Sequence, residues 1–230
     1  MRESFRQLRV LPALVAAGIF AVIVRAVVSL PPRTEGLSVQ VAEAADKSGI
    51  SNVVTAVLLD FRGYDTLLEI AVLMLATVAV LSLREGPRAL YRQISDRATP
   101  VLASLTGLLV PLALVVAVHL VWIGSTQPGG AFQGGAVLGA VGILLALSGY
   151  VRPQWVGAGT MRALLAVGFL TFLAIALLSI TAGGTLLEYP EESRKTLILI
   201  IESLLTLSIG ASLAILFLSS ASGNSGGGKR

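Results

Sequence analysis

Cysteine is absent from this chain of 230 residues, and the only histidine is His119. Without cysteine the chain has no disulfide, no thiolate metal ligand, no iron–sulfur cluster and no cysteine nucleophile. A single histidine also argues against a histidine-rich metal site. We therefore expect no bound metal and no resident cofactor.

Charged residues are also scarce, at 13% of the chain, while 55% of the residues are hydrophobic. Soluble domains carry about 25% charged residues, so this composition excludes an ordinary soluble enzyme. A bilayer-spanning helix needs about 20 mostly apolar residues. Six apolar windows qualify, at about 10–30, 66–83, 99–123, 132–151, 161–182 and 196–219, and none alternates like a barrel strand. The sequence predicts an all-α polytopic membrane bundle of about six transmembrane helices.

The basic residues predict how the chain is oriented in the membrane. If it crosses six times, eleven Lys and Arg residues fall on the side of the two termini and five on the other. Basic residues are enriched in cytoplasmic loops. We therefore expect a multi-pass protein of the cell inner (cytoplasmic) membrane with both termini in the cytoplasm. The net charge of +4 then reflects topology, and no nucleic-acid partner is expected.

Ionisable residues inside or beside the spans are candidates for an ion or proton path, because a charge within a bilayer is costly. Five residues qualify: Glu69, Asp65, Asp60, Glu202 and His119. Asp65 and Glu69 are four residues apart and share one helical face. A structural role is the alternative. Asp65 suits a helix N-terminus, the glutamates can pair with a partner protein, and His119 can be an interfacial side chain beside Trp122.

A glycine-rich turn at 127–135 separates the third and fourth windows. Its candidate turn and packing residues are Pro128, Gly129, Gly130, Phe132, Gly134, Gly135 and Gly139. Small residues continue at steps of three and four to Gly149, and such a stripe lets another helix approach closely. We expect the fourth span to be a packing helix, at the centre of the bundle or at a subunit interface.

The links and the tail carry weaker signals. In the long link 33–64, residues 37–45 can form a short surface helix. Ser51-Asn52 can cap a second one, with Val53, Val54, Val57 and Leu58 on one face. The tail from Ser222 is rich in glycine and serine, which is typical of a flexible segment.

Residues 52–84 contain the run LDFRGYDTLLE at 59–69. This run resembles the segment shared by the C-terminal part of the large Mrp antiporter protein and the MbhE component of membrane-bound hydrogenases. In that family a run of the form (L/V)-D-(F/Y)-R-G-(F/Y)-D-T-x-x-E leads into a transmembrane helix.

Residues 99–219 resemble the MnhB/MrpB family of antiporter subunits, through the run GSTQPGGAFQGG at 124–135. Ser125 stands where that family usually has histidine, and Ala131 replaces a glycine. If the family's histidine serves a proton path, whether His119 substitutes for it is open. The resemblances imply three parts: residues 1–98 with two transmembrane helices, 99–219 with four, and a flexible tail at 220–230.

Together the resemblances imply a membrane subunit of an Mrp-type Na⁺/H⁺ antiporter, working with lipid and with larger, complex-I-like antiporter subunits that hold the pumping channels. One alternative is the membrane arm of a membrane-bound hydrogenase or related energy-converting complex. Another is a structural scaffold. The sequence does not decide which cation is carried, the stoichiometry, or whether a redox module is attached.

Overall fold

The computed structural model describes residues 2–29, 39–41, 43–44, 49–83, 99–151, 157–181 and 184–221. Every regular element in these ranges is a helix, which confirms the all-α prediction. The chain divides into two units, residues 1–40 and 41–230. The first unit contains one long helix, α1 (Arg2–Val28), which includes most of the first predicted window.

The second unit contains five long helices whose bounds lie within a few residues of the predicted windows, except at the end of the fourth. They are α4 (Gly63–Ser82), α6 (Pro100–Ile123), α7 (Ala131–Leu147), α8 (Ala158–Thr181) and α9 (Arg194–Ala221). Thr99 caps α6, since its hydroxyl accepts from the Leu102 N–H, and Pro100 occupies the first turn. Proline fits in the first turn because a backbone N–H at that position would have no hydrogen-bond partner within the helix.

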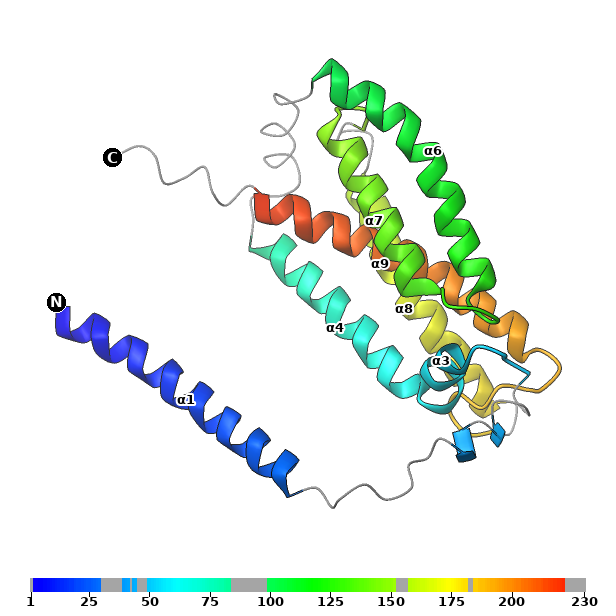
Figure 1. The fold of residues 1–230 in the computed structure, drawn as a ribbon, viewed down its shortest axis with the longest axis horizontal. Helices are drawn as coiled ribbons and strands as arrows, with labels where there is room; N and C mark the ends of the chain where they lie inside the picture. The colour runs from blue at the N-terminus through cyan, green and yellow to red at the C-terminus, as the bar shows by residue number, and fades with distance from the viewer. Residues whose placement is uncertain are drawn as a thin grey trace. The chain divides into compact units, whose positions relative to one another are not determined.

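Helix α9 occupies the centre of this unit and contacts α4, α6, α7 and α8. Figure 1 shows it, in orange and red, crossing between α4 and the pair α6 and α7. The core includes Ile198, Ile201, Leu205 and Ile209 of α9. The glycine-rich α7 instead lies between α6 and α9, so it is a packing helix but not the central one.

Within the part of the chain that the structure describes, four helices are long and apolar enough to cross a membrane: α4, α6, α8 and α9. Helix α7 is a shorter apolar helix of 17 residues, about 26 Å at 1.5 Å per residue. The predicted fourth window extended to residue 151, but α7 ends at Leu147. Gly149 follows with a φ of +76°, a left-handed conformation that commonly ends helices.

Before α4 the chain forms a short helix, α3 (Val53–Thr55), and a π-helix, η1 (Ala56–Phe61). Asn52 caps α3 as predicted, because its side chain accepts from the Val54 N–H. The buried residues of this stretch are Thr55, Ala56 and Leu59. Of the predicted apolar face, Val53 and Val54 are exposed instead, whereas Leu58 is partly buried and packs against the core.

Three predicted features fall outside the described residues, wholly or in part. The Arg-rich link at 84–98 and the tail from residue 222 lie wholly outside them. Of the predicted short helix at 37–45, residues 39–41 and 43–44 are described and helical.

Candidate functional site

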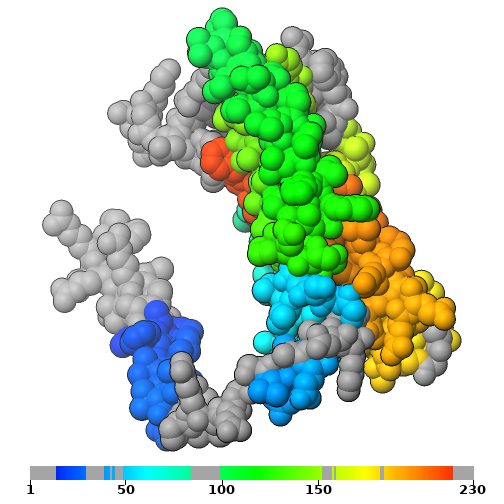
Figure 2. Space-filling view, turned by 45° about the vertical axis from the view of Figure 1, so that its right-hand side comes forward, coloured from blue at the N-terminus to red at the C-terminus, as the bar shows by residue number. Residues whose placement is uncertain are grey.

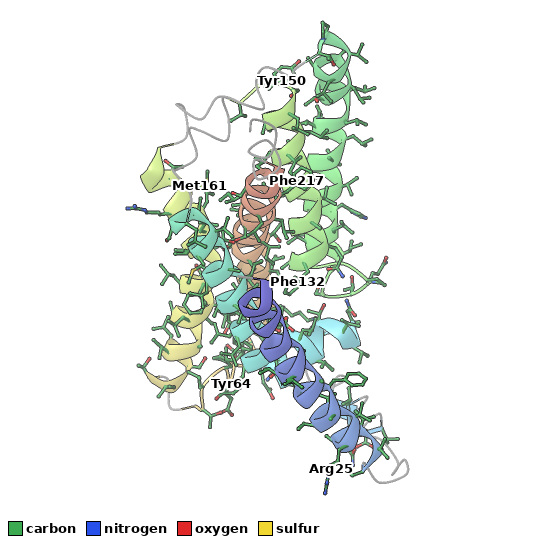
Figure 3. The ribbon with its side chains drawn as sticks, turned by 90° about the vertical axis from the view of Figure 1, so that its left-hand side faces the viewer. Arg25, Tyr64, Phe132, Tyr150, Met161 and Phe217 are labelled. Carbon is green, nitrogen blue, oxygen red and sulfur yellow. The ribbon has the colours of Figure 1, made fainter. Side chains whose placement is uncertain are left out.

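Three segments that are distant in sequence meet at one end of the second unit: residues 49–62, the turn 124–130, and the loop 184–193 with the start of α9. Figure 2 shows the cyan surface of the first segment between green α6 and the orange loop. Tyr64 lies toward this end, and Tyr150 and Met161 lie at the opposite end (Figure 3). The polar contacts of the unit concentrate at this junction.

Asn52 fastens the first segment to the glycine turn. Its amide Nδ2 donates to the carbonyl of Gly124 at 2.8 Å and to that of Gln127 at 2.7 Å. The Asn52 N–H donates to the Ser125 carbonyl at 3.0 Å. Thr55 Oγ1 donates to the same Gly124 carbonyl at 2.5 Å. These bonds join chain positions about 70 residues apart.

The turn itself folds back onto α6. The Gly130 N–H donates to the Leu120 carbonyl at 2.8 Å, which places the start of α7 about one turn below the end of α6. A Cβ on Gly129 would lie 2.4 Å from the Leu120 carbonyl oxygen, and Gly130 has a φ of +105°. Both positions therefore require glycine. Figure 3 shows Phe132, at the start of α7, farther from this end of the unit than Tyr64.

A second polar contact joins Asp60 of η1 to Arg194 at the start of α9, with Oδ1 and Nε 3.7 Å apart. Both side chains are largely buried, and Arg194 Nη2 also donates to the Tyr189 carbonyl. Burial raises the pKa of Asp60, and the positive charge of Arg194 offsets part of that rise. Burial and then the charge of Asp60 raise the pKa of Tyr189. The ion pair thus holds the first segment against α9.

Glu202 is the most enclosed of the predicted acidic residues, with only 3% of its surface exposed. It lies about two turns into α9 and receives a hydrogen bond from the backbone of Ala131 at the start of α7. Its Oε1 packs against the glycine turn. The N-cap residue of α7, Gly130, supplies no side-chain cap, so a carboxyl from α9 takes that role.

Asp65 and Glu69 have different surroundings. Asp65 lies in the first turn of α4 and forms an ion pair with Arg62 three residues earlier. Glu69 is exposed on α4, one turn farther along, and faces away from the rest of the unit. Their four-residue spacing places Asp65 and Glu69 on the same side of α4. Both remain at least partly exposed there, whereas Glu202 is buried.

His119 is exposed on α6. The buried positions of that part of α6 are Ala117 and Val121 instead. This position of His119 does not decide whether it substitutes for the family histidine, which Ser125 replaces. Pro128 and Phe132 are exposed, whereas Gly130, Gly134, Gly135 and Gly139 are buried.

The small residues of α7 pack on α9. A Cβ on Gly135 would lie 2.7 Å from Ile209 Cγ2, and one on Gly139 would lie 3.1 Å from Leu213 Cβ. On the α9 side, a Cβ on Gly210 would lie 2.8 Å from Leu138 Cβ. The stripe therefore serves a contact within the chain, where glycine allows the helices to approach closely.

In the sequence alone, Arg194 is one basic residue of a loop and Asn52 is a helix cap. Their cross-chain partners, Asp60 and the Gly124 carbonyl, are 134 and 72 residues away. The signal that could have found them was the clustering of polar residues at helix ends. Among the described residues no group of three or more His, Asp or Glu is arranged to hold a metal ion.

Among curated proteins, the chain is 31% identical over 209 residues to a protein of Rhizobium meliloti described as the probable A/B subunit of a K⁺/H⁺ antiporter, covering 80% of this chain and 20% of that protein. It is 29% identical over 153 residues to an uncharacterized protein of Methanocaldococcus jannaschii, covering 59% and 58%. The chain thus spans less than two thirds of each of these relatives.

Two solved structures share the fold. One is the Mrp complex from Dietzia sp., with a TM-score of 0.64, 20% identity, and coverage of 93% of this chain and 26% of that chain. The other is the membrane-bound sulfane sulfur reductase, an archaeal respiratory membrane complex, with a TM-score of 0.65, 21% identity, and coverage of 92% and 97%.

Two family patterns match the chain itself. Residues 5–95 match the MbhE family, described as the E component of MBH. Residues 101–221, more than half of the chain, match the domain related to the MnhB subunit of Na⁺/H⁺ antiporters. With its apolar helices and its glycine turn between α6 and α7, this chain is a multi-pass membrane protein that belongs to the MnhB-related family.

Proposed function

We propose that this chain is a membrane subunit of an Mrp-type cation/proton antiporter in the cell inner membrane, where it helps to form the ion path together with larger antiporter subunits. The family match and the antiporter relative support the reaction class. The single observation that carries the role of this chain is Glu69, an exposed carboxyl inside a span.

Glu69 lies six residues after the start of α4, about 9 Å along the helix axis. Its neighbours on the exposed side, Leu68 and Val72, are apolar. A carboxylate facing lipid at such a depth costs on the order of 2.5 kcal/mol or more. We infer that a neighbouring protein of the complex covers this face, and that Glu69 exchanges a proton or meets the transported cation there.

The experiment is Glu69→Gln in the assembled complex, with proton flux measured in inverted vesicles and complex level checked on the same samples. Glutamine keeps the shape and the hydrogen bonding but cannot titrate, so flux should be abolished while assembly persists. Glu69→Asp should retain part of the flux. Glu191→Gln, the same change at an exposed loop position, is the matched control and should transport normally.

If Glu69→Gln assembles and transports like the wild type, the carboxyl is structural and the chain is a scaffold within the complex. If Glu69→Gln instead fails to assemble while Glu191→Gln assembles, Glu69 serves the contact with its neighbour and not the ion path.

A second candidate function is the membrane arm of a reaction-coupled complex. The observation that favours it is the fold similarity to a chain of the sulfane sulfur reductase, of which this chain covers 97%. Co-purification in mild detergent separates the two candidates. Soluble partners with iron–sulfur absorbance support the reaction-coupled complex, and antiporter subunits alone support the stand-alone antiporter.

A further inference from the structure

The carboxyl of Glu202 lies in a closely fitted polar site between α9, the start of α7 and the glycine turn. A Cβ built on Gly130 would lie 2.6 Å from Glu202 Oε1, and one on Gly124 would lie 3.2 Å from it. These two glycines therefore leave the space that the carboxyl fills. On the other side of the turn, the Gly124 carbonyl is held by Asn52 and Thr55, so this wall of the site is fixed.

The two oxygens of this carboxyl differ in their surroundings. The carboxyl receives a hydrogen bond from the backbone of Ala131, the first residue of α7. Oε2 is buried and has no hydrogen-bond partner among the described residues. Burying a carboxylate that has one oxygen without a hydrogen bond costs free energy, and burying the neutral carboxylic acid costs less.

No cation from the described parts of the surrounding helices neutralises this carboxyl. Helix α7 contains no charged residue, and α8 contains only Arg162, near its start. On α4, Asp65 and Glu69 point away from the core, and His119 of α6 is exposed. Arg194 precedes Glu202 by eight residues on α9, about 12 Å along the axis, and is engaged by Asp60.

We propose that Glu202 is a proton-binding site, in which Oε2 takes up a proton from water and releases it again while the α7 N-terminus and the glycine turn hold the carboxyl in place. What the proton is used for rests on the proposed function, since an antiporter needs groups that exchange protons within its membrane domain. The turn residues Gln127 and Pro128, which precede the two glycines at positions 129 and 130, are exposed, so the site lies near a surface from which water can supply the proton.

A proton suits the site better than a metal cation. The carboxyl fills the space that Gly124 and Gly130 leave, so a proton fits on Oε2 without further room, whereas a metal cation needs room for itself and for several ligands. The oxygens of the Gly124 carbonyl and Thr55 are already engaged with each other. Among the described residues around the carboxyl, few oxygens are therefore left to join Glu202 as ligands of a metal cation, which requires several.

The test is infrared difference spectroscopy of the purified full-length chain in lipid nanodiscs, titrated from neutral to alkaline pH. The wild type should show the carbonyl band of a protonated carboxylic acid that is lost on deprotonation. Glu202→Gln should lack this band, and Glu191→Gln should retain it. Adding Na⁺ or K⁺ at constant pH should leave the band unchanged.

Glu202→Asp serves if the glutamine variant does not fold, because it keeps an acid and should move the band to the position of an aspartic acid. The proposal is overturned if the wild type shows no such band, if the band persists unchanged in Glu202→Gln or Glu202→Asp, or if Na⁺ or K⁺ displaces the proton. The spectrum needs no transport partner. Normal flux in Glu69→Gln would thus refute the proposed function without touching this result.

Discussion

At the scale of single residues, a few polar side chains hold distant parts of the chain together. Asn52 donates to two carbonyls of the glycine turn and to Thr55 Oγ1, while its side-chain carbonyl oxygen accepts from the Val54 N–H. An amide suits this position because it combines donors with an acceptor. A carboxylate of the same shape offers acceptors only.

We therefore expect Asn52→Asp to destabilise the chain by about 2–3 kcal/mol, because it loses the donated bonds and places a carboxylate oxygen against carbonyl oxygens. The measurement is thermal unfolding of the full chain in detergent. Ser51→Ala, at the exposed neighbouring position, is the control and should unfold like the wild type. Equal unfolding temperatures for Asn52→Asp and the wild type would show that the turn is held by other contacts.

Asp60 and Glu188 should affect stability with opposite dependence on pH. Burial raises the pKa of Asp60 above its ordinary value of 3.8, so the folded state holds this proton more tightly than the unfolded chain does. The stabilisation that Asp60 contributes is therefore complete below the pKa of the unfolded state, and it is lost as pH rises through the pKa of the folded state. Hydrogen bonds from Thr185 lower the pKa of Glu188 below 4.5, so its contribution is lost as pH falls.

Asp60→Asn should abolish the decline of stability with rising pH, and Glu188→Gln should abolish part of the loss on acidification. The measurement is the unfolding temperature from about pH 3 to 7. Slopes are compared because Asp60→Asn also removes the charge that faces Arg194 wherever Asp60 is ionised, which changes the level of stability as well as its dependence on pH. If Asp60→Asn keeps the wild-type decline of unfolding temperature with rising pH, that decline comes from another titrating group.

At the scale of elements, close contact between helices decides the packing, and α9 is the helix that the others approach. A Cβ on Gly168 of α8 would lie 2.8 Å from Ser208 Cβ and 2.9 Å from Leu205 Cα. Both atoms belong to or adjoin the α9 backbone, so they cannot move aside like the end of a flexible side chain. Gly159, on the same helix, has no atom within 4 Å of its Cβ position.

Gly168→Ala should therefore destabilise the chain by about 1–3 kcal/mol through overpacking, while Gly159→Ala should change stability little. Unfolding of both variants in detergent, followed by circular dichroism, measures the difference. Equal unfolding temperatures for the two variants would mean that α8 and α9 can separate enough to admit the extra methyl group.

At the scale of the whole molecule, the junction segments define one end of the second unit, since residues 49–62, 124–130 and 184–194 meet there. The asymmetry of eleven against five basic residues predicts that this end faces outward. The orientation follows from loop charge, and the helix packing within the second unit is compatible with it because each of its long described helices runs to or from this end.

The absence of native cysteine makes single-cysteine labelling decisive. Thr126→Cys, in the exposed part of the turn, should react with an impermeant thiol reagent on intact cells. Ser4→Cys, Ser95→Cys and Ser222→Cys should react only after permeabilisation. Labelling of Ser95→Cys from outside would reverse the predicted topology.

Local patterns in the sequence predict the helices, their approximate ends and the family. Apolar runs and caps such as Thr99 and Asn52 act within a few neighbouring residues, so their effect can be recognised locally. The glycine turn was recognisable because its pattern is continuous along the chain. The end of α7 was missed because apolar residues continue past Gly149, and the conformation of that glycine is what ends the helix.

The surroundings of each acidic residue depend instead on how the helices pack. Glu69 and Glu202 looked alike in sequence, each one to two turns inside an apolar span, yet one is exposed and the other is buried. When a span is apolar on all sides, its sequence does not indicate which face will pack against other helices. That choice depends on close approach between helices, as at Gly168 and Gly210, and on pairs such as Asp60 and Arg194, whose members are brought together only by folding.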